Sequence, residues 1–433
     1  MIRQFVTFSV LIAAIVVQYA RAQQPIKLTL REAADLALKN HPQILAAQNE
    51  AAFTNQLITE TRSAYYPTLQ AQVTASQSNH DARIGAGSLS DSRLFNRFGQ
   101  GITMSQLITD LGRTKNLVAS SRFFAQSSSQ TYQATRYDVI ARVNQAYYDV
   151  LHAQSLVKVA EQTVAARQLL FDQVDTLARN SLKSQLDVSF ASVAVSEAKL
   201  LLIRAQDGVQ EAFAELSRSI GSDQAASYQL VDEPLPPTPP AKPDELIVQA
   251  ANNRPELASL RFARDSARSY EEAEKDLTKP TVSLVGVAGF LPFINQVSST
   301  PIPSEYEGAA VNISIPIFNG HLFSARREAA HYRTLEADQL LRDRQEQIAR
   351  DVSVAWASTT TAFQRIDVTA QFLRQAALGL DLAQGRYNLG LSSIVELTQA
   401  QLSVTQAEIE NLNAKYDYQR QYAALQYTVG LLR

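Results

Sequence analysis

The sequence of 433 residues predicts a mainly α-helical fold with a β-barrel part. We expect long antiparallel coiled-coil helices, and four β-strands per chain that contribute to a barrel shared between chains. Three observations predict this fold class. The sequence contains two copies of one unit. Each copy has a very long stretch that lacks glycine and proline, and also two short segments in which apolar and polar residues alternate.

The first 22 residues have the layout of a secretory signal peptide. Arg3 precedes an apolar run at 5–17, and Ala-Arg-Ala at 20–22 provides a cleavage site of the A-x-A type. The apolar run is short for a hydrocarbon core of ~30 Å, so a signal peptide at 1–22 is favoured over a membrane anchor. The chain contains no cysteine, which excludes disulfides, Cys-ligated zinc and lipidation of an N-terminal cysteine. We therefore expect an exported chain without covalent cross-links.

Matching motifs show that the sequence is a duplication. Pro42 in KNHPQI corresponds to Pro255 in NNRPEL at an offset of 213 residues, and the offset is 209 residues from Ser105 and Ser314 onward. Two copies are too few for a solenoid, so we interpret them as one duplicated unit. The sequence thus predicts a first structural repeat at 23–221, a proline-rich extended linker at 222–243 and a second structural repeat at 244–433.

The spacing of helix breakers predicts a long helical hairpin in each repeat. Neither glycine nor proline occurs at 113–207 or at 321–378. Valine recurs at every seventh residue at Val143, Val150 and Val157, with alanines between these positions. Such heptads predict left-handed supercoiling, and small residues at the seam let helices approach closely. An ordinary coiled coil with a solvated outer face would show the same pattern, so the helices alone leave the architecture open.

Two segments in each repeat alternate with a period of two residues, as β-strands do. The clearest are TLQAQVTASQS within Pro67–Asp110 and AAVNISIPIFN within Pro280–Asn319, and their partners GQGITMSQLIT and TVSLVGVAGF alternate more weakly. Each predicted strand has about ten residues, the length of a tilted membrane-spanning strand. Such alternation, with aromatic residues near the ends, is typical of an outer-membrane barrel with a water-filled interior. A soluble four-stranded sheet has the same alternation and stays an alternative at this point.

Four strands are too few to close a membrane barrel, which usually has at least about 8 strands. Unpaired strand edges are not tolerated in lipid, so several chains must share one barrel if these strands span the membrane. Three chains with four strands each would supply twelve, enough to surround an aqueous lumen. The loops at 79–97 and 291–307 would then face the outside of the cell.

The sequence contains no recognisable catalytic, cofactor-binding or metal-binding constellation. Its five histidines lack the spacing of metal-ligand pairs, and the Gly-x-Gly at 99–101 lacks the third glycine and the βαβ context of a dinucleotide-binding loop. The net charge of −2 and the lack of a basic stripe with interleaved aromatic residues argue against nucleic-acid binding. We therefore expect no enzyme, no cofactor and no nucleic-acid partner.

Four motifs, taken in order, resemble those of one protein family. They are LTLREAADLALKNHPQI near the start, MSQLITDLGR and ISIPIFNGH at the strand-to-helix joins, and RYNLGLSSIVELTQAQ before the last helix. Over nearly the whole mature chain, the sequence resembles the TolC-like outer-membrane efflux proteins, which are the outer membrane factors of tripartite efflux and type I secretion systems. The resemblance rests on the order of the motifs, the duplication and the helix lengths together.

The resemblance implies a passive exit duct in the outer membrane of a Gram-negative-type cell. It implies a homotrimer whose shared twelve-stranded barrel lies in outer-membrane lipid. It also implies that the long helices form a periplasmic α-barrel, a tunnel that crosses the periplasm. The implied partners are a periplasmic adaptor (membrane fusion protein) and an inner-membrane transporter, which would supply the energy. A soluble periplasmic coiled-coil scaffold or adhesin is the competing hypothesis, and the sequence specifies no transported substrate.

Two breaks in the long helices lie at equivalent places in the repeats. Each break is followed by Ser-x-x-acid, a capping-box spacing that relates Ser184 to Asp187 and Ser393 to Glu396. The resemblance implies that the breaks are hairpin tips at the periplasmic end of the tunnel, where the aperture opens and the adaptor docks. It assigns twelve residues to the adaptor-docking tips: Arg179, Asn180, Ser181, Leu182, Lys183, Ser184, Asn388, Leu389, Gly390, Leu391, Ser392 and Ser393.

The resemblance also assigns the periplasmic aperture to Asp187, Tyr387, Ser392, Glu396 and Gln399. Three copies of Glu396 would form an acidic ring that favours cations, and Tyr387 would tie the second hairpin to its neighbour near Asp187. The chain departs from the family pattern at Ser392, which replaces a latch arginine, and at Gln399, which replaces a second acid. The resemblance therefore implies a weaker latch and a less negative aperture.

Glycines at three turns depart from the family pattern as well. The strand-to-helix joins of the family carry a glycine pair, whereas this chain keeps Gly112 in one join and Gly320 in the other. At the first hairpin break, Ser181 occupies the place of Gly390. We expect the left-handed backbone there to fall on Asn180, because asparagine tolerates this conformation.

Overall fold

The computed structural model of the chain describes residues 26–77, 83–84, 92–93, 97–222, 228–240, 242–294 and 304–432. The expected signal peptide at 1–22 lies outside the described residues, as does much of each expected loop at 79–97 and 291–307. Within the described ranges, no helix combines the length and the apolar character that crossing a bilayer requires.

The two halves of the chain repeat the same order of elements. The first half contains α2 (Leu30–Asn40), α3 (Pro42–Arg62), β2 (Thr68–Ser76), β5 (Arg97–Thr109), α4 (Arg113–Arg179) and α5 (Gln185–Ile220). The second contains α6 (Asp244–Asn253), α7 (Pro255–Lys275), β7 (Thr281–Ile294), β8 (Glu305–Ser314), α8 (Leu322–Asn388) and α9 (Ile394–Val429). Helices α4 and α8 have 67 residues each, which is about 100 Å at 1.5 Å per residue. The expected long helices and their hairpin partners are confirmed.

Shorter elements complete the chain. Single 3-10 turns, η1 (Ser63–Tyr65) and η3 (Asp276–Thr278), connect α3 to β2 and α7 to β7. The short strands β1 (Ile26–Leu28) and β6 (Tyr228–Leu230) pair in parallel, and β3 (Arg83–Ile84) pairs with β4 (Ser92–Arg93).

The described residues form two compact units, and each unit contains segments of both repeats. The first unit contains the described residues within 26–46, 133–254 and 347–432, so it includes both hairpin turns. The second unit contains residues 47–132 and 255–346, so it includes the four long strands. Helices α4 and α8 contribute residues to both units.

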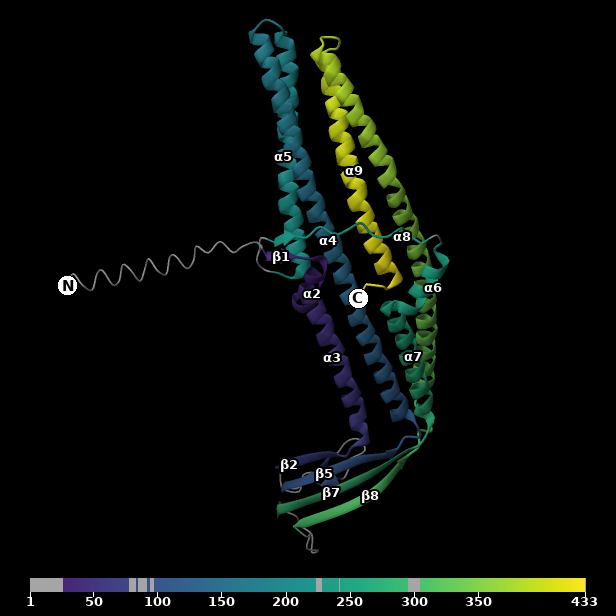
Figure 1. Ribbon diagram of the computed structural model, residues 1–433. Coiled ribbons are helices and arrows are strands. Elements are labelled where there is room, and N and C mark those ends of the chain that lie inside the picture. Colours follow the sequence, from purple (N-terminus) through teal and green to yellow (C-terminus); the bar gives the residue numbers. More distant parts are fainter. Residues whose placement is uncertain are drawn as a thin grey trace, which may run out of the picture. The chain divides into compact units, whose positions relative to one another are not determined.

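The second unit contains an antiparallel sheet with the strand order β2-β5-β7-β8 (Figure 1). Thr68 on β2 lies opposite Ser105 on β5, and Ser105 lies opposite Val285 on β7. The pair β5–β7 therefore joins the two repeats. The outer edges of β2 and β8 pair with no strand of the described residues. The four expected strands are confirmed, and they lie in one sheet.

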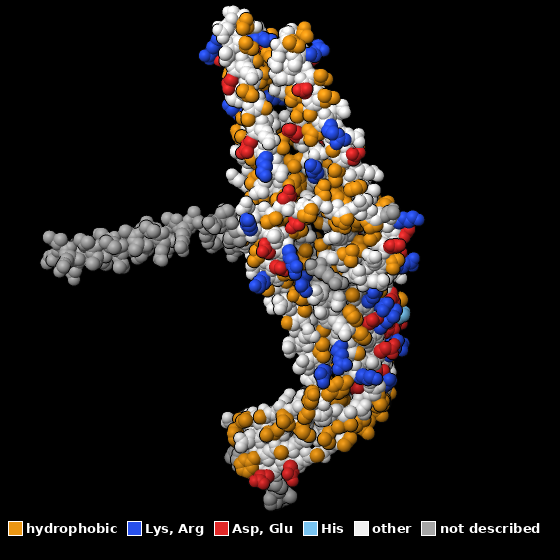
Figure 2. All heavy atoms as spheres, viewed as in Figure 1, with side chains coloured by type: hydrophobic (Ala, Val, Ile, Leu, Met, Phe, Trp, Pro, Cys, Tyr) orange, Lys and Arg blue, Asp and Glu red, His pale blue; other side chains and the backbone are white. Residues whose placement is uncertain are grey.

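The register of this sheet separates an apolar face from a polar face, because residues opposite each other share a face. One face carries mainly apolar residues: Leu69, Val73, Ile102, Met104, Leu284, Val311 and Ile313. The other carries mainly polar residues: Thr68, Gln70, Gln72, Thr74, Thr103, Ser105, Ser283 and Asn312. Leu69 is 68% exposed and Val311 65%, and Figure 2 shows hydrophobic side chains gathered over these strands. No described part of the chain covers this apolar surface.

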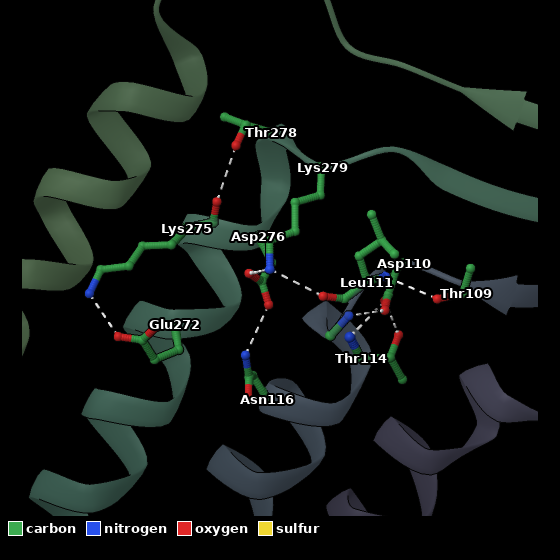
Figure 3. Close-up of polar contacts among 11 residues, drawn as sticks. Thr109, Asp110, Leu111, Thr114, Asn116, Glu272, Lys275, Asp276, Thr278 and Lys279 are labelled. Atoms are coloured by element: carbon green, nitrogen blue, oxygen red, sulfur yellow. Dashed lines mark hydrogen bonds and ion pairs between the residues drawn. The ribbon is translucent and has the colours of Figure 1, made fainter.

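A tight join leads from the second strand of each repeat into the long helix. Leu111 (φ 55°) and Gly112 (φ 117°) form the first join, and Gly320 (φ 61°) and His321 (φ 68°) form the second. In the first join, Oδ1 of Asp110 accepts a hydrogen bond from the backbone N–H of Gly112 at 3.2 Å (Figure 3). One glycine per join is sufficient here because a non-glycine residue adopts the other positive φ.

Gly112→Ala is expected to destabilise the protein more than Gly320→Ala. A Cβ at residue 112 would lie 3.1 Å from Oδ2 of Asp276 at a φ of 117°, whereas a Cβ at residue 320 would meet no atom within 4 Å. We expect a cost of about 2–3 kcal/mol for Gly112→Ala and about 1 kcal/mol for Gly320→Ala. Thermal unfolding in detergent measures both variants, and equal losses would contradict this assignment of strain.

Hydrogen bonds from helical side chains hold the segment between the repeats. Residues 231–240, which we call the strap, form no helix or strand. Four side chains donate to strap carbonyls: Tyr147 to Val231 (2.7 Å), Gln419 to Glu233 (2.9 Å), Tyr418 to Pro237, and Trp356 to Pro240 (2.8 Å). Burial raises the pKa of Tyr147 to about 12, so its hydroxyl stays protonated and can donate at neutral pH.

Candidate functional site at the hairpin ends

Both long helices end in the same hydrogen-bonding pattern at their hairpin turns. In the first hairpin, the N–H of Leu182 donates to the carbonyl of Leu177 at 2.9 Å, and the N–H of Ser181 donates to that of Ala178 at 2.9 Å. In the second hairpin, Leu391 and Gly390 donate to Arg386 (2.8 Å) and Tyr387 (3.0 Å). Each pair of bonds is a Schellman motif, which requires left-handed backbone one residue after the C-cap.

This motif overturns the expectation for Asn180. Ser181 adopts the left-handed backbone with a φ of 61°, and its counterpart Gly390 does so with a φ of 71°. The two backbone hydrogen bonds fix the position of the left-handed residue, so the better intrinsic tolerance of asparagine does not decide it. Asn180 instead donates from Nδ2 to the carbonyl of Thr176 at 2.8 Å.

The second helix of each hairpin begins at a serine cap, and the two caps differ. Oγ of Ser184 accepts from the N–H of Asp187 at 3.2 Å, and the Asp187 carboxylate accepts from the N–H of Ser184 at 3.1 Å. This is a complete capping box. Oγ of Ser393 accepts from the N–H of Glu396 at 3.3 Å, but the Glu396 carboxylate lies 3.4 Å from Nε of Arg386. The carboxylate of Glu396 therefore does not complete the cap at Ser393 and pairs with the Arg386 guanidinium instead.

An apolar cluster joins the two hairpins just before their turns. We call it the tip cluster, and its buried members are Leu170, Val174, Val188, Ala191, Ala383, Tyr387, Ile394 and Leu397. They come from all four long helices, α4, α5, α8 and α9. Burial of such side chains stabilises the contact by about 1.5–3 kcal/mol for each large one. Within one chain, the hairpin ends are therefore held together by apolar packing.

Tyr387 is the polar member of the tip cluster. The residue is 5% exposed, and its hydroxyl oxygen is buried without a hydrogen-bond partner among the described residues. Nζ of Lys183 lies 4.0 Å from the centre of the Tyr387 ring, a cation–π contact between the two hairpins. Burial raises the pKa of Tyr387, and the negative charge of Asp187 raises it further. Asp187, Lys183 and Tyr387 therefore form one electrostatic group across the hairpin pair.

The remaining aperture residues lie around this group with different exposures. Glu396 and Gln399 are exposed, whereas Asp187 and Ser392 are half-buried. Oγ of Ser392 is buried without a partner among the described residues. The structure therefore brings Asp187 close enough to Tyr387 to affect its pKa, and it leaves the Glu396 side chain open to solvent.

The adaptor-docking residues form exposed turns with apolar tips. Three leucines at the turns are largely exposed: Leu182 (69%), Leu389 (76%) and Leu391 (66%). The other assigned docking residues are also exposed, except the half-buried Lys183 and Ser392. Exposed leucines clustered at a chain turn are typical of a contact surface for another protein.

Two features of the site were not predicted from the sequence. Arg386 pairs with Glu396 across the turn, and Lys183 packs on Tyr387 although its expected role was docking. Opposite charges on either side of a turn are the only sequence signal for the first pair, and such signals are common on helical surfaces. Among the described residues, no group of three or more histidine, acidic or cysteine side chains could hold a metal ion.

Comparisons with known proteins relate this geometry to a family. The family model of outer membrane efflux proteins matches residues 33–222 and 246–431. Outer membrane protein TolC of Vibrio cholerae is 24% identical over 93% of this chain and 91% of its own length. Alkaline protease secretion protein AprF of Pseudomonas aeruginosa is 25% identical over 94% of this chain and 85% of its own.

Solved structures share the fold along nearly the whole chain. The outer membrane protein VceC of Vibrio cholerae superimposes with a TM-score of 0.80 at 18% identity, covering 93% of this chain and 96% of VceC. A membrane protein of Pseudomonas aeruginosa gives a TM-score of 0.79 at 22% identity, covering 93% of both chains. The expected fold class, outer-membrane location and duct function are confirmed, and the soluble scaffold or adhesin finds no support. The chain belongs to the outer membrane efflux protein family.

Proposed function

We propose that three copies of this chain form an exit duct that receives cargo from an inner-membrane transporter through a periplasmic adaptor. The uncovered apolar face of the β2-β5-β7-β8 sheet, with its two open edges, carries the trimer proposal. Open edges cannot remain in lipid, and four strands cannot close alone, so neighbouring copies must supply the missing strands. The polar face of the sheet would then line a water-filled lumen.

The proposed gate is the pair of hairpin ends. Packing in the tip cluster supports a closed resting state, because opening would expose side chains such as Leu397 (0% exposed) and Val174 (0% exposed). The exposed leucines at the turns support docking of an apolar adaptor surface nearby. Adaptor binding would then offset the cost of separating the hairpins, as a ligand shifts an equilibrium only through its differential affinity for the two states.

Efflux and protein secretion both remain compatible with this duct. Among the relatives, the name of AprF refers to secretion of an alkaline protease, and Protein CyaE of Bordetella pertussis is 24% identical over 86% of this chain. Co-purification from cells that express candidate adaptors and transporters would identify the partners. A duct that co-purifies with no adaptor in any candidate set would contradict the tripartite part of the proposal.

The trimeric duct is tested by purification and conductance. The mature chain should require detergent, migrate as a trimer in a native mass measurement and conduct ions in planar bilayers. Heat-dissociated protein from the same preparation provides the control and should conduct nothing. A detergent-free monomer without conductance would contradict the duct.

Glu396→Lys is expected to lower the preference of the channel for cations. Three exposed carboxylates near the aperture attract cations, and lysines at the same place would repel them. Arg386→Gln is the matched control, and we expect it to have the opposite effect. It removes the guanidinium that lies 3.4 Å from the Glu396 carboxylate, so the negative charge of Glu396 is less compensated and the preference for cations should rise. Reversal potentials in a salt gradient measure both variants. Unchanged selectivity in Glu396→Lys would remove Glu396 from the aperture.

A further inference from the structure

A polar cluster lies where the two repeats meet beside the sheet, and we call it the internal joint. Asp276 is buried in η3, directly after α7. Its carboxylate accepts from Nδ2 of Asn116 at 2.9 Å and pairs with Nζ of Lys279 at 2.6 Å (Figure 3). The Lys279 ammonium also donates to the carbonyl of Leu111 at 3.2 Å. One side of this joint comes from η3 and the residue that follows it, and the other comes from the turn between β5 and α4 and from the first turns of α4.

Because the sequence is duplicated, each side of the internal joint has a counterpart in the other repeat. The counterparts of the two sides do not touch each other within one chain. With the offset of 213 residues, Asp276 and Lys279 correspond to Ser63 and Tyr66 beside β2. With the offset of 209 residues, Leu111 and Asn116 correspond to Gly320 and Ala325 beside β8. Strands β2 and β8 are the opposite edges of the sheet, so one chain cannot bring these surfaces together.

The described residues leave both of these surfaces, at Ser63 and Tyr66 and at Gly320 and Ala325, exposed to solvent. Ser63 is exposed although its counterpart Asp276 is buried, and Ala325 is exposed although its counterpart Asn116 is half-buried. Gly320 is exposed, and Tyr66 is 62% exposed. Beside them, Ile317 is 94% exposed and Phe318 is 81% exposed. Large apolar side chains with such exposure indicate a surface that a partner covers.

We propose that these two surfaces meet between neighbouring copies of the chain and form an external joint built on the plan of the internal one. The proposal rests on the trimer of the proposed function and specifies which residues touch. Strand β8 of one copy would pair with β2 of the next in the register of β5 with β7. The pair Ser105–Val285 then becomes Ser314–Gln72, and Ile102–Ala288 becomes Val311–Ala75.

This register agrees with the faces of the sheet. Ser314 and Gln72 both belong to the polar face, and Val311 and Ala75 both belong to the apolar face, so the two faces continue unbroken across the contact. A shift by one residue would place apolar side chains of one copy beside polar side chains of the next. The register copied from β5 and β7 is therefore consistent with the polar and apolar faces of β8 and β2.

The two joints differ in their chemistry. The ionic side chains Asp276 and Lys279 are replaced by Ser63 and Tyr66, and Asn116 is replaced by Ala325. In the external joint, the Tyr66 hydroxyl would stand where Lys279 stands and donate to the carbonyl of Gly320. Ionic joints within chains would therefore alternate with neutral, largely apolar joints between chains. Salt should weaken the first kind more than the second, because it screens charges and leaves apolar burial intact.

Cysteine pairs test the register, and the chain offers a clean background because it contains no cysteine. The double variant Ser314→Cys/Gln72→Cys should form disulfide-linked dimers and trimers on mild oxidation. Cross-strand disulfides need Cβ atoms about 3.5–4.5 Å apart, close to the spacing of directly opposite residues and shorter than that of diagonal ones. The shifted pair Ser314→Cys/Thr74→Cys should give several-fold less linked product.

The repeat supplies a matched control for this experiment. Ser105→Cys/Val285→Cys has the same relation inside one chain and should oxidise without forming covalent oligomers. If a conducting trimer forms but the shifted pair links better than Ser314→Cys/Gln72→Cys, the register is wrong while the duct stands. If the protein is monomeric in detergent, the proposed function fails first.

A second set of variants tests the joint itself. Ser63→Asp places an unpaired carboxylate in the neutral external joint and should lower the temperature at which the trimer dissociates. Adding Tyr66→Lys and Ala325→Asn would rebuild the partners of the internal joint and should restore that temperature. The dissociation temperature can recover only if the substituted residues of neighbouring copies touch. If the triple variant dissociates as early as Ser63→Asp alone, these residues do not meet.

Discussion

Leu397→Ala should loosen the contact between the two hairpins and raise the open probability of the channel. Leu397 is 0% exposed and belongs to the tip cluster, where truncation to alanine removes packing from all sides. Such substitutions cost about 2–5 kcal/mol in well-packed sites. Single-channel recording should show longer openings, and hydrogen exchange should show faster opening of the hairpin ends.

Val395→Ala provides the matched control for this experiment. Val395 lies two residues away on α9 and is 51% exposed, so its truncation removes little packing. Conductance and exchange in this variant should match the unaltered protein. If Leu397→Ala leaves both measurements unchanged, the tip cluster does not hold the gate closed.

Arg326→Met should destabilise the sheet-containing unit by about 3–5 kcal/mol, because it leaves a buried carboxylate without its main partner. The Glu274 side chain is fully buried, and its two oxygens accept from Nε and Nη2 of Arg326 at 2.6 and 2.8 Å. The next cation, Arg113, lies 3.9 Å away. The hydrogen bond to Glu274 also raises the pKa of Arg326, which agrees with a strong pairing. Thermal unfolding in detergent measures the loss.

Two further variants separate this effect from a general loss of charge. Arg342→Met breaks the pair with Glu346, whose side chains are 74% and 69% exposed, and should cost less than about 1 kcal/mol. Arg326→Met/Glu274→Gln should recover part of the stability, because it removes the buried charge as well. A double variant less stable than Arg326→Met alone would contradict the buried-charge explanation.

The long helices and strands were predictable because the sequence patterns that indicate them extend over many residues. Stretches without helix breakers extend over whole helices, and alternation extends over whole strands, so local errors average out. The duplication strengthened both predictions, since the same order of elements occurs in each half. The same averaging is unavailable at turns, where one residue decides the outcome.

The candidate site shows where sequence reasoning ends. The serine caps were predictable, because their spacing is a local rule, and the complete capping box at Ser184 follows it. Glu396 has the same spacing, yet its carboxylate pairs with Arg386, a residue on the other helix of the hairpin. Ser181 adopts the left-handed backbone because the Schellman hydrogen bonds require it there. Both outcomes depend on how two helices are placed, which no short window of sequence contains.

The strap has a consequence for how this chain can change over generations. All four helical donors contact carbonyl groups of the strap, and a carbonyl is present whatever the side chain. Mutations within residues 231–240 should therefore accumulate freely, provided that the extended path is kept. Tyr147 and Trp356 occupy equivalent places in the two repeats and should be substituted far less often. Each supplies a side-chain hydrogen-bond donor to a strap carbonyl that few other residues could provide.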